Sequence, residues 1–441
     1  MDISNIKITD EFKTAFDMLE KSSGHIFLTG EAGTGKSTLL EYFRSKTGKE
    51  LIVLAPTGVA AVNVRGETIH SFFQFSPGIE PENITKKIWD KNKRTLIENL
   101  DAIVIDEISM VRADLLDCID KSLRLNRPKK FSGLPFGGVQ MIFIGDLFQL
   151  PPVLTKNEEE IFKSKYKSPY FFDSRVFLDL EFNYISLKEV HRQKDEDFIS
   201  ILNKIRHGAV DEYDLELLNE RVDEYLNYLE DYYIYLSTTN YIADKVNQAK
   251  LAELEGDTYK FEGELLGKFS ENQTPADVEI NLKPGAQIML LNNDSEGRWI
   301  NGTIGKLEDV YERKPGQQVL VATLENGESV EIDKFTWNKY KFDINPLTNE
   351  VKEEVIGSFS QFPVRLAWGI TIHKSQGKTF EHVVIDIGRG TFVPGQLYVA
   401  LSRCTNLNGI ILRRRIEPEH IWTDDRLKQF VDYLDQKLTE E

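Results

Sequence analysis

The sequence predicts an α/β protein with two parallel-sheet domains in tandem and a small β domain inserted into the second. Three observations support this fold class. Short apolar strands alternate with helical segments over residues 1–180, and each strand ends in polar residues. The same texture fills 181–256 and returns at 358–441. Between these two segments, residues 257–357 consist of short alternating runs separated by turn signals, which are typical of a small β domain.

Charge and composition exclude several classes of protein. The 441 residues carry 54 lysines and arginines against 71 aspartates and glutamates, and the net charge of −17 argues against a nucleic-acid coat. Positive residues nevertheless cluster at 86–94 and 413–415, which leaves room for a narrow nucleic-acid track. No apolar run approaches membrane-spanning length, and the acidic N-terminus lacks a signal-peptide core. We therefore expect a protein of the cell interior, in the cytoplasm or nucleoid, with no membrane partner.

The two cysteines, Cys118 and Cys404, lie far apart in the sequence and belong to no Cys/His cluster. Disulfide frameworks and zinc sites are both recognised by closely spaced cysteines or by cysteines combined with histidines. Neither a disulfide framework nor a zinc site is therefore expected.

A glycine-rich turn follows the first predicted strand, which begins at His25. The stretch GEAGTGKST matches the phosphate-loop pattern G-x-x-x-x-G-K-[ST] and leads directly into a helix. Glycines let successive backbone N–H groups point at phosphate oxygens, and the helix start adds the positive end of its dipole. Lys36 would reach the β and γ phosphates, and the Ser37 hydroxyl would ligate Mg²⁺. The predicted nucleoside-triphosphate site consists of Gly30, Glu31, Ala32, Gly33, Thr34, Gly35, Lys36, Ser37 and Thr38.

Polar residues end two further predicted strands of the first domain. Asp106 and Glu107 follow the strand at 102–105, and Gln149 lies beyond the strand at 139–144. Ligands of a parallel sheet gather at the carboxyl ends of its strands. An acidic residue there can hold Mg²⁺, and an adjacent carboxylate can orient and deprotonate the attacking water. Gln149 would sense the γ-phosphate, and a bridge between backbone groups is the alternative.

The remaining elements follow from apolar spacing and turn residues. Residues 9–22 show helical spacing ahead of the phosphate loop, and Asn326 with Gly327 marks a hairpin in the β domain. In the first domain we also predict a strand at 51–55 and a helix at 59–64. In the second we predict strands at 184–187, 232–237, 362–368, 382–388 and 409–415, helices at 241–254 and 395–403, and a polar helix or loop at 369–380.

Taken in order, the motifs of the chain resemble those of the superfamily 1 DNA helicases. More narrowly they resemble the Pif (petite integration frequency) family, with RecD-like helicases as near relatives. The motifs span nearly the whole chain and read GEAGTGKST, APTGVAA with TIHSFF, IDEISM, GDLFQLPPV, LKEVHRQ, AWGITIHKSQGKTF and VALSR. The resemblance implies two RecA-like P-loop domains. The first covers 1–180 with a small insertion at about 65–98, and the second covers 181–256 and 358–441, interrupted by an SH3-like β-barrel at 257–357.

The resemblance also assigns roles to residues of the second domain. It implies that Arg192 and Arg403 are arginine fingers and that Gly377 and Lys378 contact the nucleotide. Charge on the transferred phosphoryl group requires planar cationic donors, and supplying them across a cleft couples hydrolysis to domain closure. Ordinary surface ion pairs are the alternative for either arginine. The catalytic set is then Lys36, Asp106, Glu107, Gln149, Arg192 and Arg403, with Ser37 and Asp106 as the Mg²⁺ ligands.

The comparison with this family places single-stranded DNA on both α/β domains. Hydroxyls and amides bond phosphate oxygens, and aromatic rings stack on bases without reading them. For Phe72 and Phe73 core packing is the alternative. The implied DNA contacts are Pro56, Thr57, Gly58, His70, Ser71 and Phe72 on the first domain, and Thr371, His373, Lys374, Ser375 and Gln376 on the second.

One position departs from the family pattern. The family carries an adenine-recognising glutamine in the N-terminal helix, in a Glu-Gln context, whereas Glu11 is followed here by Phe12. Selectivity for ATP over other nucleotides is therefore not implied by this position.

The resemblance implies an ATP- and Mg²⁺-dependent helicase that moves 5′ to 3′ on single-stranded DNA and unwinds forked or tailed duplexes. It further implies action on G-quadruplexes, roles in DNA repair, recombination, replication or telomere maintenance, and a monomer or a DNA-induced dimer. Two alternatives stay open at this point. One is a RecD-like subunit of a nuclease complex, and the other is an ATP-driven switch that binds nucleic acid without translocating.

Overall fold

The computed structural model describes residues 8–31, 33–76, 78–152, 154, 156–189, 195–224, 232–345, 348, 351–388 and 390–440. The chain forms two compact units. The N-terminal unit comprises Asp2–His191, Asn338–Gly357 and Asp425–Glu441, and the C-terminal unit comprises Arg192–Trp337 and Ser358–Asp424. Across the described ranges, no helix combines the length and the apolar character needed to cross a membrane.

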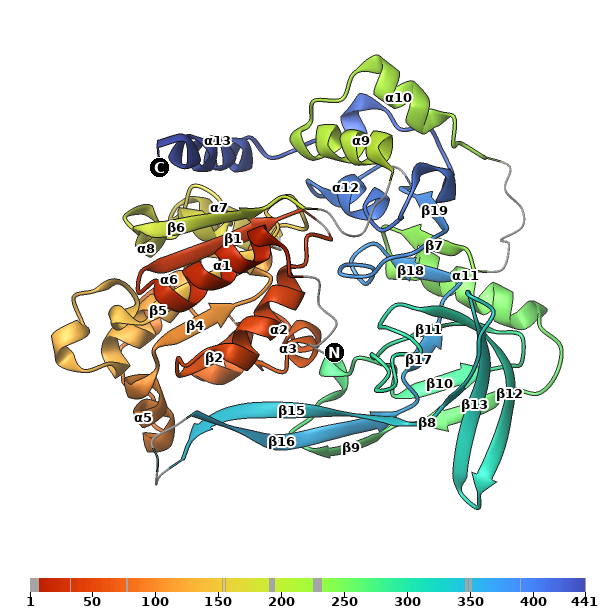
Figure 1. The fold of residues 1–441 in the computed structure, drawn as a ribbon, viewed down its shortest axis with the longest axis horizontal. Helices are drawn as coiled ribbons and strands as arrows, with labels where there is room; N and C mark the ends of the chain where they lie inside the picture. The colour runs from red at the N-terminus through yellow and green to blue at the C-terminus, as the bar shows by residue number, and fades with distance from the viewer. Residues whose placement is uncertain are drawn as a thin grey trace. The chain divides into compact units, whose positions relative to one another are not determined.

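A six-stranded sheet organises the N-terminal unit, with strand order β3-β2-β4-β5-β1-β6 and parallel pairing throughout. Strands β2, β4, β5, β1 and β6 of this sheet are labelled in Figure 1. The strands are β1 His25–Gly30, β2 Leu51–Ala55, β3 Glu67–Thr68, β4 Ala102–Ile105, β5 Gln140–Gly145 and β6 Phe182–Leu187. The helices are α1 Asp10–Lys21, α2 Lys36–Lys46, α3 Gly58–Asn63, α4 Ile69–Phe73, α5 Lys91–Asn99, α6 Ala113–Asn126, α7 Lys156–Lys163, α8 Arg175–Leu178 and α13 Asp425–Glu440.

Helices cover both faces of this sheet, because successive side chains of a strand point to opposite faces. Ile26 and Leu28 of β1 belong to a buried cluster that includes residues of α1 and α2. Phe27, between them, instead contacts the rings of Phe171 and Tyr184, with centroids 5.6 and 5.7 Å away. Burying one such large apolar side chain stabilises the fold by about 1.5–3 kcal/mol. A strand buried on both faces explains the continuous apolar run from which β1 was predicted.

Two segments expected in the second domain belong to the N-terminal unit. The strand predicted at 184–187 is β6, which pairs with β1 along its whole length. Helix α13, within the expected 358–441 segment, packs on this unit through Phe430, whose ring stacks on Phe172 at 4.1 Å. Long-range pairing and packing decide both placements, and neither is visible in the local sequence.

The C-terminal unit contains the second parallel sheet, in the order β18-β7-β19-β20. This sheet confirms the predicted second α/β domain. The motif at 369–380 opens with a strand, β18, and not with the predicted polar helix or loop. The strands are β7 Ile234–Ser237, β18 Gly369–Thr371, β19 Val383–Asp386 and β20 Ile410–Leu412, and the helices are α9 Glu196–His207, α10 Glu212–Asn219, α11 Asn240–Glu253 and α12 Gln396–Leu401.

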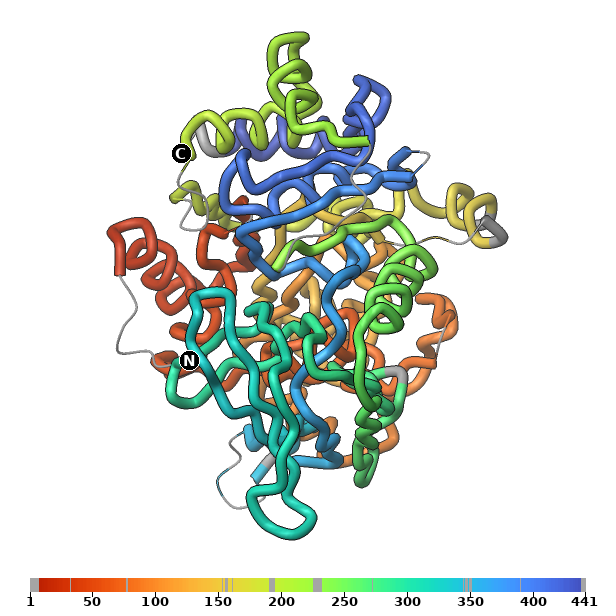
Figure 2. The backbone as a smooth tube through the Cα atoms, turned by 90° about the vertical axis from the view of Figure 1, so that its right-hand side faces the viewer, coloured from red at the N-terminus to blue at the C-terminus, as the bar shows by residue number. Residues whose placement is uncertain are grey.

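The inserted β module is built on a five-stranded antiparallel sheet, in the order β14-β13-β12-β11-β17. Its long β12–β13 hairpin projects from the rest of the module (Figure 2). The strand predicted at 362–368 is β17, and it pairs with β11 of this module instead of extending the second parallel sheet. The remaining strands are β8 Tyr259–Glu262, β9 Glu264–Gly267, β10 Glu279–Leu282, β11 Gln287–Leu290, β12 Ile304–Lys314, β13 Gln317–Leu324, β14 Ser329–Ile332, β15 Phe335–Ile344, β16 Val351–Gln361 and β17 Val364–Leu366.

The outer part of the β15 and β16 ribbon, residues 338–357, belongs to the N-terminal unit and not to the β module in which it was expected. Lys93 of α5 explains this grouping, because its buried ammonium donates to the Phe342 carbonyl of β15 at 3.3 Å. The same ammonium pairs with Glu67 at 3.1 Å. Buried polar groups of three segments therefore satisfy one another.

Candidate nucleotide site and nucleic-acid contacts

The predicted phosphate loop joins β1 directly to α2. Gly33 and Gly35 adopt φ angles of 89° and 83°, a left-handed region that glycine enters without steric cost. At Gly30 a Cβ atom would lie 2.5 Å from Thr34 Oγ1 and 2.8 Å from the Leu187 carbonyl oxygen. A side chain does not fit there, so the packing of the loop requires glycine at its first position.

The Lys36 side chain folds back into the loop. Its Nζ donates to the carbonyl oxygens of Gly30 at 2.8 Å and Glu31 at 2.9 Å. Ser37 is exposed on the first turn of α2, so its hydroxyl is open to a ligand. Ala32 lies outside the described residues. A helix start, a curled loop and an ammonium at one place provide the positive potential that a phosphate requires.

The strand order brings the other predicted catalytic residues to the same edge. Strands β4, β5 and β1 are neighbours, so Asp106 after β4 and Gln149 beyond β5 share an edge with the phosphate loop. Burial raises the pKa of Asp106 to about 6, and the positive charge of Lys36 opposes this shift. The effect of Lys36 on this pKa shows that the Asp106 carboxylate lies close enough to the lysine to interact with its charge.

Glu107 adopts a left-handed backbone conformation immediately after β4, with φ 52° and ψ 45°. Such a conformation is uncommon for a residue with a side chain and is concentrated at functional sites. The structure thus sets the second acid of the pair apart from an ordinary strand end.

Gln149 is almost fully buried and donates from Nε2 to Asp146 Oδ2 at 3.1 Å. Asp146, the residue after β5, also accepts from the Phe148 backbone at 3.1 Å. Asp146 is not among the site residues predicted from the sequence. It orients the amide of Gln149. The sequence feature that could have identified it is its position directly after a buried strand.

The first group of predicted DNA contacts lies around α3 and α4. Thr57 is exposed, and its Oγ1 caps α3 by accepting from Ala60 N at 3.2 Å, with Pro56 and Gly58 partly exposed beside it. The cap fixes this turn without burying the threonine. These residues therefore remain available for a ligand.

The residues of α4 differ strongly in exposure. His70 is half-buried, and burial lowers its pKa against the opposing charge of Asp114. Ser71 donates to Glu67 Oε1 at 2.7 Å. Phe72 is fully buried, with Lys93 Nζ 3.9 Å from its ring centroid. The structure favours the packing alternative for Phe72, because no ring face is open to a base.

The second group of predicted DNA contacts forms a compact turn after β18. Thr371 is buried and caps the turn, its Oγ1 accepting from Lys374 N at 3.2 Å. The buried Ser375 hydroxyl donates to the Ile372 carbonyl at 2.7 Å. His373 and Lys374 are exposed at the top of the turn, and Gln376 is partly exposed. The threonine and serine therefore shape the turn that presents their neighbours.

Arg403 is fully buried just after α12 and contacts the turn at residues 371–378. Its guanidinium donates to the carbonyls of Ser375 and Lys378 at 3.4 and 3.3 Å, and to Val399 at 2.9 Å. The surface-ion-pair alternative is therefore wrong for Arg403. Arg192 lies outside the described residues.

Lys378, a predicted nucleotide contact, has its ammonium directed at the β module. Nζ donates to Asn301 Oδ1, and burial together with the charge of Arg365 lowers the pKa of Lys378 to about 7. Gly377 beside it is exposed and has φ 77°. The lysine thus links the motif turn to the loop before β12.

Phe12, which replaces the expected glutamine, packs edge-on against Tyr42 with ring centroids 5.4 Å apart. Glu11 accepts from the backbone amides of Lys188 and Glu189 at 2.8 and 3.2 Å. The Glu11 carboxylate therefore attaches α1 to the residues that follow β6.

Two parallel sheets in one chain, the first carrying a phosphate loop beside an acidic strand end, define a P-loop nucleoside triphosphatase with tandem RecA-like domains. A sequence model of the PIF1-like helicase family matches residues 7–216. The ATP-dependent DNA helicase Pif1 of Bdellovibrio bacteriovorus is 32% identical over 420 residues, which cover 93% of this chain and 89% of that protein. The chain therefore belongs to the PIF1-like helicase family.

Solved structures agree with this assignment. Bacteroides sp Pif1 in complex with ADP-AlF4 is similar with a TM-score of 0.91, at 37% identity over 98% of both chains. A Pif1 helicase from Bacteroides in complex with ADP-AlF3 and ssDNA gives a TM-score of 0.68 at 38% identity, again over 98% of both chains. The family match confirms the narrower of the two resemblances drawn from the motifs.

Proposed function

We propose that this protein is an ATP-dependent DNA helicase that moves 5′ to 3′ along single-stranded DNA. The observation that carries the proposal is the shared edge of β4, β5 and β1, where the phosphate loop, the acidic pair and Gln149 meet. The relatives are named as ATP-dependent DNA helicases, and the Bacteroides protein binds ADP-AlF3 and ssDNA together.

The nucleotide is bound through the loop and the start of α2. Backbone N–H groups of residues 33–37 would surround the phosphates, and the Lys36 ammonium would exchange its carbonyl partners for phosphate oxygens. The exposed Ser37 hydroxyl and the Asp106 carboxylate are hard oxygen ligands at one edge, which fits Mg²⁺. When bound, that ion supplies positive charge to the β and γ phosphates.

Hydrolysis uses Glu107 as the general base and Gln149 as the group that positions the attacking water. Glu107 accepts the proton of the water, while Asp146 holds the Gln149 amide in a fixed orientation. Arg192 and Arg403 would supply positive charge to the transferred phosphoryl group. Arg403 releases carbonyls of the 371–378 turn when it does so, which couples nucleotide chemistry to the DNA-binding turn.

Single-stranded DNA is bound through the predicted contact residues of both units, among which Thr57, His373 and Lys374 are the exposed ones. Pro56, Thr57, Gly58, His70 and Ser71 lie in one group, and the turn from Thr371 to Gln376 forms the other. Hydroxyls, amides and backbone N–H groups bond phosphate oxygens without reading the bases. Movement along single-stranded DNA would open forked and tailed duplexes and G-quadruplexes.

The direct test measures ATP hydrolysis with and without single-stranded DNA, beside unwinding of duplexes with a 5′ or a 3′ tail. Stimulated hydrolysis and unwinding from the 5′ tail alone are expected. Unwinding from the 3′ tail would overturn the polarity. DNA-stimulated hydrolysis without strand displacement would identify a non-translocating switch, and omission of Mg²⁺ should abolish both activities.

A further inference from the structure

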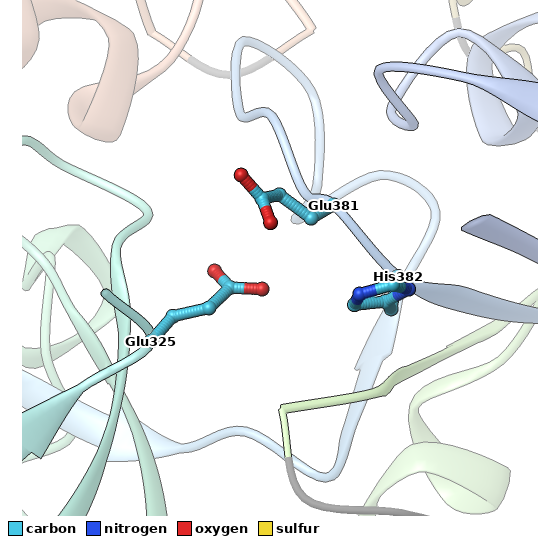
Figure 3. Close-up of side chains that lie close together, drawn as sticks. All are labelled: Glu325, Glu381 and His382. Carbon is cyan, nitrogen blue, oxygen red and sulfur yellow. The ribbon is translucent and has the colours of Figure 1, made fainter. Parts of the chain in front are cut away.

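Three side chains of metal-binding type meet in the C-terminal unit, away from the residues assigned above. One ligand atom each from Glu325, Glu381 and His382 lies within 4.8 Å of the other two. The Glu325 carboxylate points toward both the Glu381 carboxylate and the His382 ring (Figure 3). Glu325 follows β13, whereas the other two residues lead into β19. The cluster therefore joins the β module to the second parallel sheet.

The backbone fixes all three residues. Glu325 N donates to the Ile304 carbonyl at 3.1 Å, and the Ile234 amide donates to the His382 carbonyl at 3.2 Å. The Glu381 carbonyl accepts from Cys404 Sγ at 3.2 Å. The positions of the side chains thus follow from two sheets and a helix end, and not from a single mobile loop.

Two polar atoms of the cluster are buried without a hydrogen-bond partner. They are Glu325 Oε1 and His382 Nδ1, among the few buried side-chain atoms in the described structure that lack one. The His382 ring stacks on Tyr233 at 4.8 Å, which fixes its plane. A buried polar atom without a partner is costly and indicates an absent water, ion or functional role.

The charges of the cluster indicate which kind of ligand fits. Two carboxylates face each other, and among the described residues no ion pair to Glu325 is found. Carboxylates this close together repel each other when both are ionised. A cation between the carboxylates removes this repulsion and gives the buried oxygen and ring nitrogen a partner.

We propose that Glu325, Glu381 and His382 form a binding site for a divalent transition-metal ion, with zinc as its representative. One imidazole and two carboxylates are a ligand set that zinc accepts, whereas calcium and magnesium prefer oxygen ligands alone. Metal bonds of about 2.0–2.2 Å require the ligand atoms to close up by about 1 Å. The long glutamate side chains provide this movement, and the exposure of Glu381 leaves a coordination position for water.

A bound ion would tie the turn after β13 to the start of β19. The site shares no residue with the nucleotide site, so metal binding and ATP binding are separate properties. Sequence spacing did not reveal the site because zinc patterns are recognised by closely spaced ligands, and Glu325 is far from the other two along the chain.

The test titrates tag-free protein with zinc by calorimetry, in a large excess of Mg²⁺ that saturates the nucleotide site. One equivalent of zinc should bind, and Glu325→Gln, Glu381→Gln and His382→Gln should each weaken binding at least tenfold. Cobalt should give visible absorption that the three variants lack. Hydrogen exchange of residues 324–328 should slow when zinc is added to the wild-type protein.

Matched controls keep the outcome interpretable. Glu328→Gln changes an exposed acid of the same turn, and His207→Gln changes an exposed histidine of α9, so both should bind zinc as the wild type does. Glu381→Gln alters an exposed side chain and should leave circular dichroism and DNA-stimulated ATP hydrolysis unchanged. The proposal would be overturned if the wild-type protein does not bind zinc. It would also be overturned if a variant that combines Glu325→Gln, Glu381→Gln and His382→Gln binds zinc as tightly as the wild type. In that case a proton shared between the two carboxylates accounts for the cluster.

Discussion

Glu107 stands out at the proposed nucleotide site because its backbone is left-handed. Its left-handed conformation costs on the order of 1–3 kcal/mol, and the surrounding structure must offset that cost. Asp106 beside it continues from β4 and donates its amide to the Leu54 carbonyl at 2.9 Å. The two acids are therefore not equivalent, although the sequence presents them as a pair.

The first prediction separates chemistry from binding at Glu107. Because the proposed role is proton acceptance, Glu107→Gln should lower the rate of ATP hydrolysis by roughly 10²- to 10⁴-fold. The affinity for ATP, measured with a fluorescent analogue, should stay within about threefold, since the glutamine keeps the size of the side chain. Glu181→Gln, at an exposed position before β6, is the control. Normal hydrolysis by Glu107→Gln would remove this residue from the mechanism.

The second prediction concerns pH and His25. Burial lowers the pKa of His25 to about 4, and its Nδ1 accepts from Met141 N at 3.0 Å. The unfolded chain binds a proton at His25 between pH 6.5 and 4 while the folded chain does not, so stability falls as the pH is lowered through this range. The loss should reach about 2–3 kcal/mol at pH 4.

Replacing His25 with Asn keeps an acceptor near the Nδ1 position and removes the titration. Urea unfolding at pH 7 and pH 4.5 should therefore show a smaller pH-dependent loss of stability for His25→Asn than for the wild type. His207→Asn, at an exposed histidine, serves as the comparison. If His25→Asn loses as much stability on acidification as the wild type, another group is responsible.

Among the secondary-structure elements, buried polar contacts hold the β15 and β16 ribbon on the N-terminal unit. Lys93 of α5 and Glu67 of β3 are exposed by only 1% and 2% at their side chains. Glu67 also accepts from the Phe342 backbone amide at 3.3 Å, so both partners of the ion pair bind the same strand. The attachment of β15 to the N-terminal unit therefore depends on both the Lys93 ammonium and the Glu67 carboxylate.

The third prediction follows from this pair. Glu67→Gln leaves the Lys93 ammonium buried without a compensating charge and should destabilise the protein by about 3–5 kcal/mol in urea unfolding. The double variant Glu67→Gln/Lys93→Met removes both charges and should recover a large part of that loss. Glu80→Gln, which breaks a surface pair with Lys165, should cost less than about 1 kcal/mol. No difference between the buried and surface variants would contradict this account.

The fourth prediction concerns the packing of α13. Phe430 is 6% exposed and stacks on Phe172, and Arg426 of the same helix pairs with Asp173 at 2.6 Å. Phe430→Ala should destabilise the N-terminal unit by about 3–5 kcal/mol because it opens a cavity under the helix. Tyr433→Ala, at a ring that is 49% exposed, should have a much smaller effect. Thermal unfolding and hydrogen exchange of α13 would measure both.

For the whole molecule, the net charge of −17 restricts how the protein holds DNA. Binding driven by many lysine–phosphate contacts would meet repulsion from the rest of the surface. The predicted contacts are mainly hydroxyls, amides and backbone groups, which bond phosphates without releasing many counterions.

The fifth prediction is a shallow salt dependence. With about one to three phosphates neutralised, the slope of log K against log salt for single-stranded DNA should be about −1 to −2. Fluorescence anisotropy between low and high salt measures it. Lys374→Gln, at an exposed residue of the second-domain turn, should reduce the slope by a little under 1. A slope near −10 would indicate a broad basic face instead.

Much of the fold and of the nucleotide site was predictable because its signals are local. β2 and β4 match the predicted boundaries, and the phosphate loop leads into α2 as its pattern requires. The strand after residue 181 was assigned to the wrong domain because a strand's partner is not encoded in its own residues. Phe72 illustrates the same limit, since helical spacing near a motif does not distinguish a ring that stacks on a ligand from one that packs in the core.

The sequence by itself determined the class of chemistry, because glycines, a lysine, a serine and an acidic strand end must stand at short fixed spacings to form a phosphate site. Tertiary structure alone decided which residues support that chemistry and which serve the fold. The orientation of Gln149 by Asp146, the place of Arg403 beneath the 371–378 turn and the meeting of Glu325 with Glu381 and His382 all depend on packing between distant segments. Such contacts form when whole sheets and helices pack together, and no local spacing specifies them.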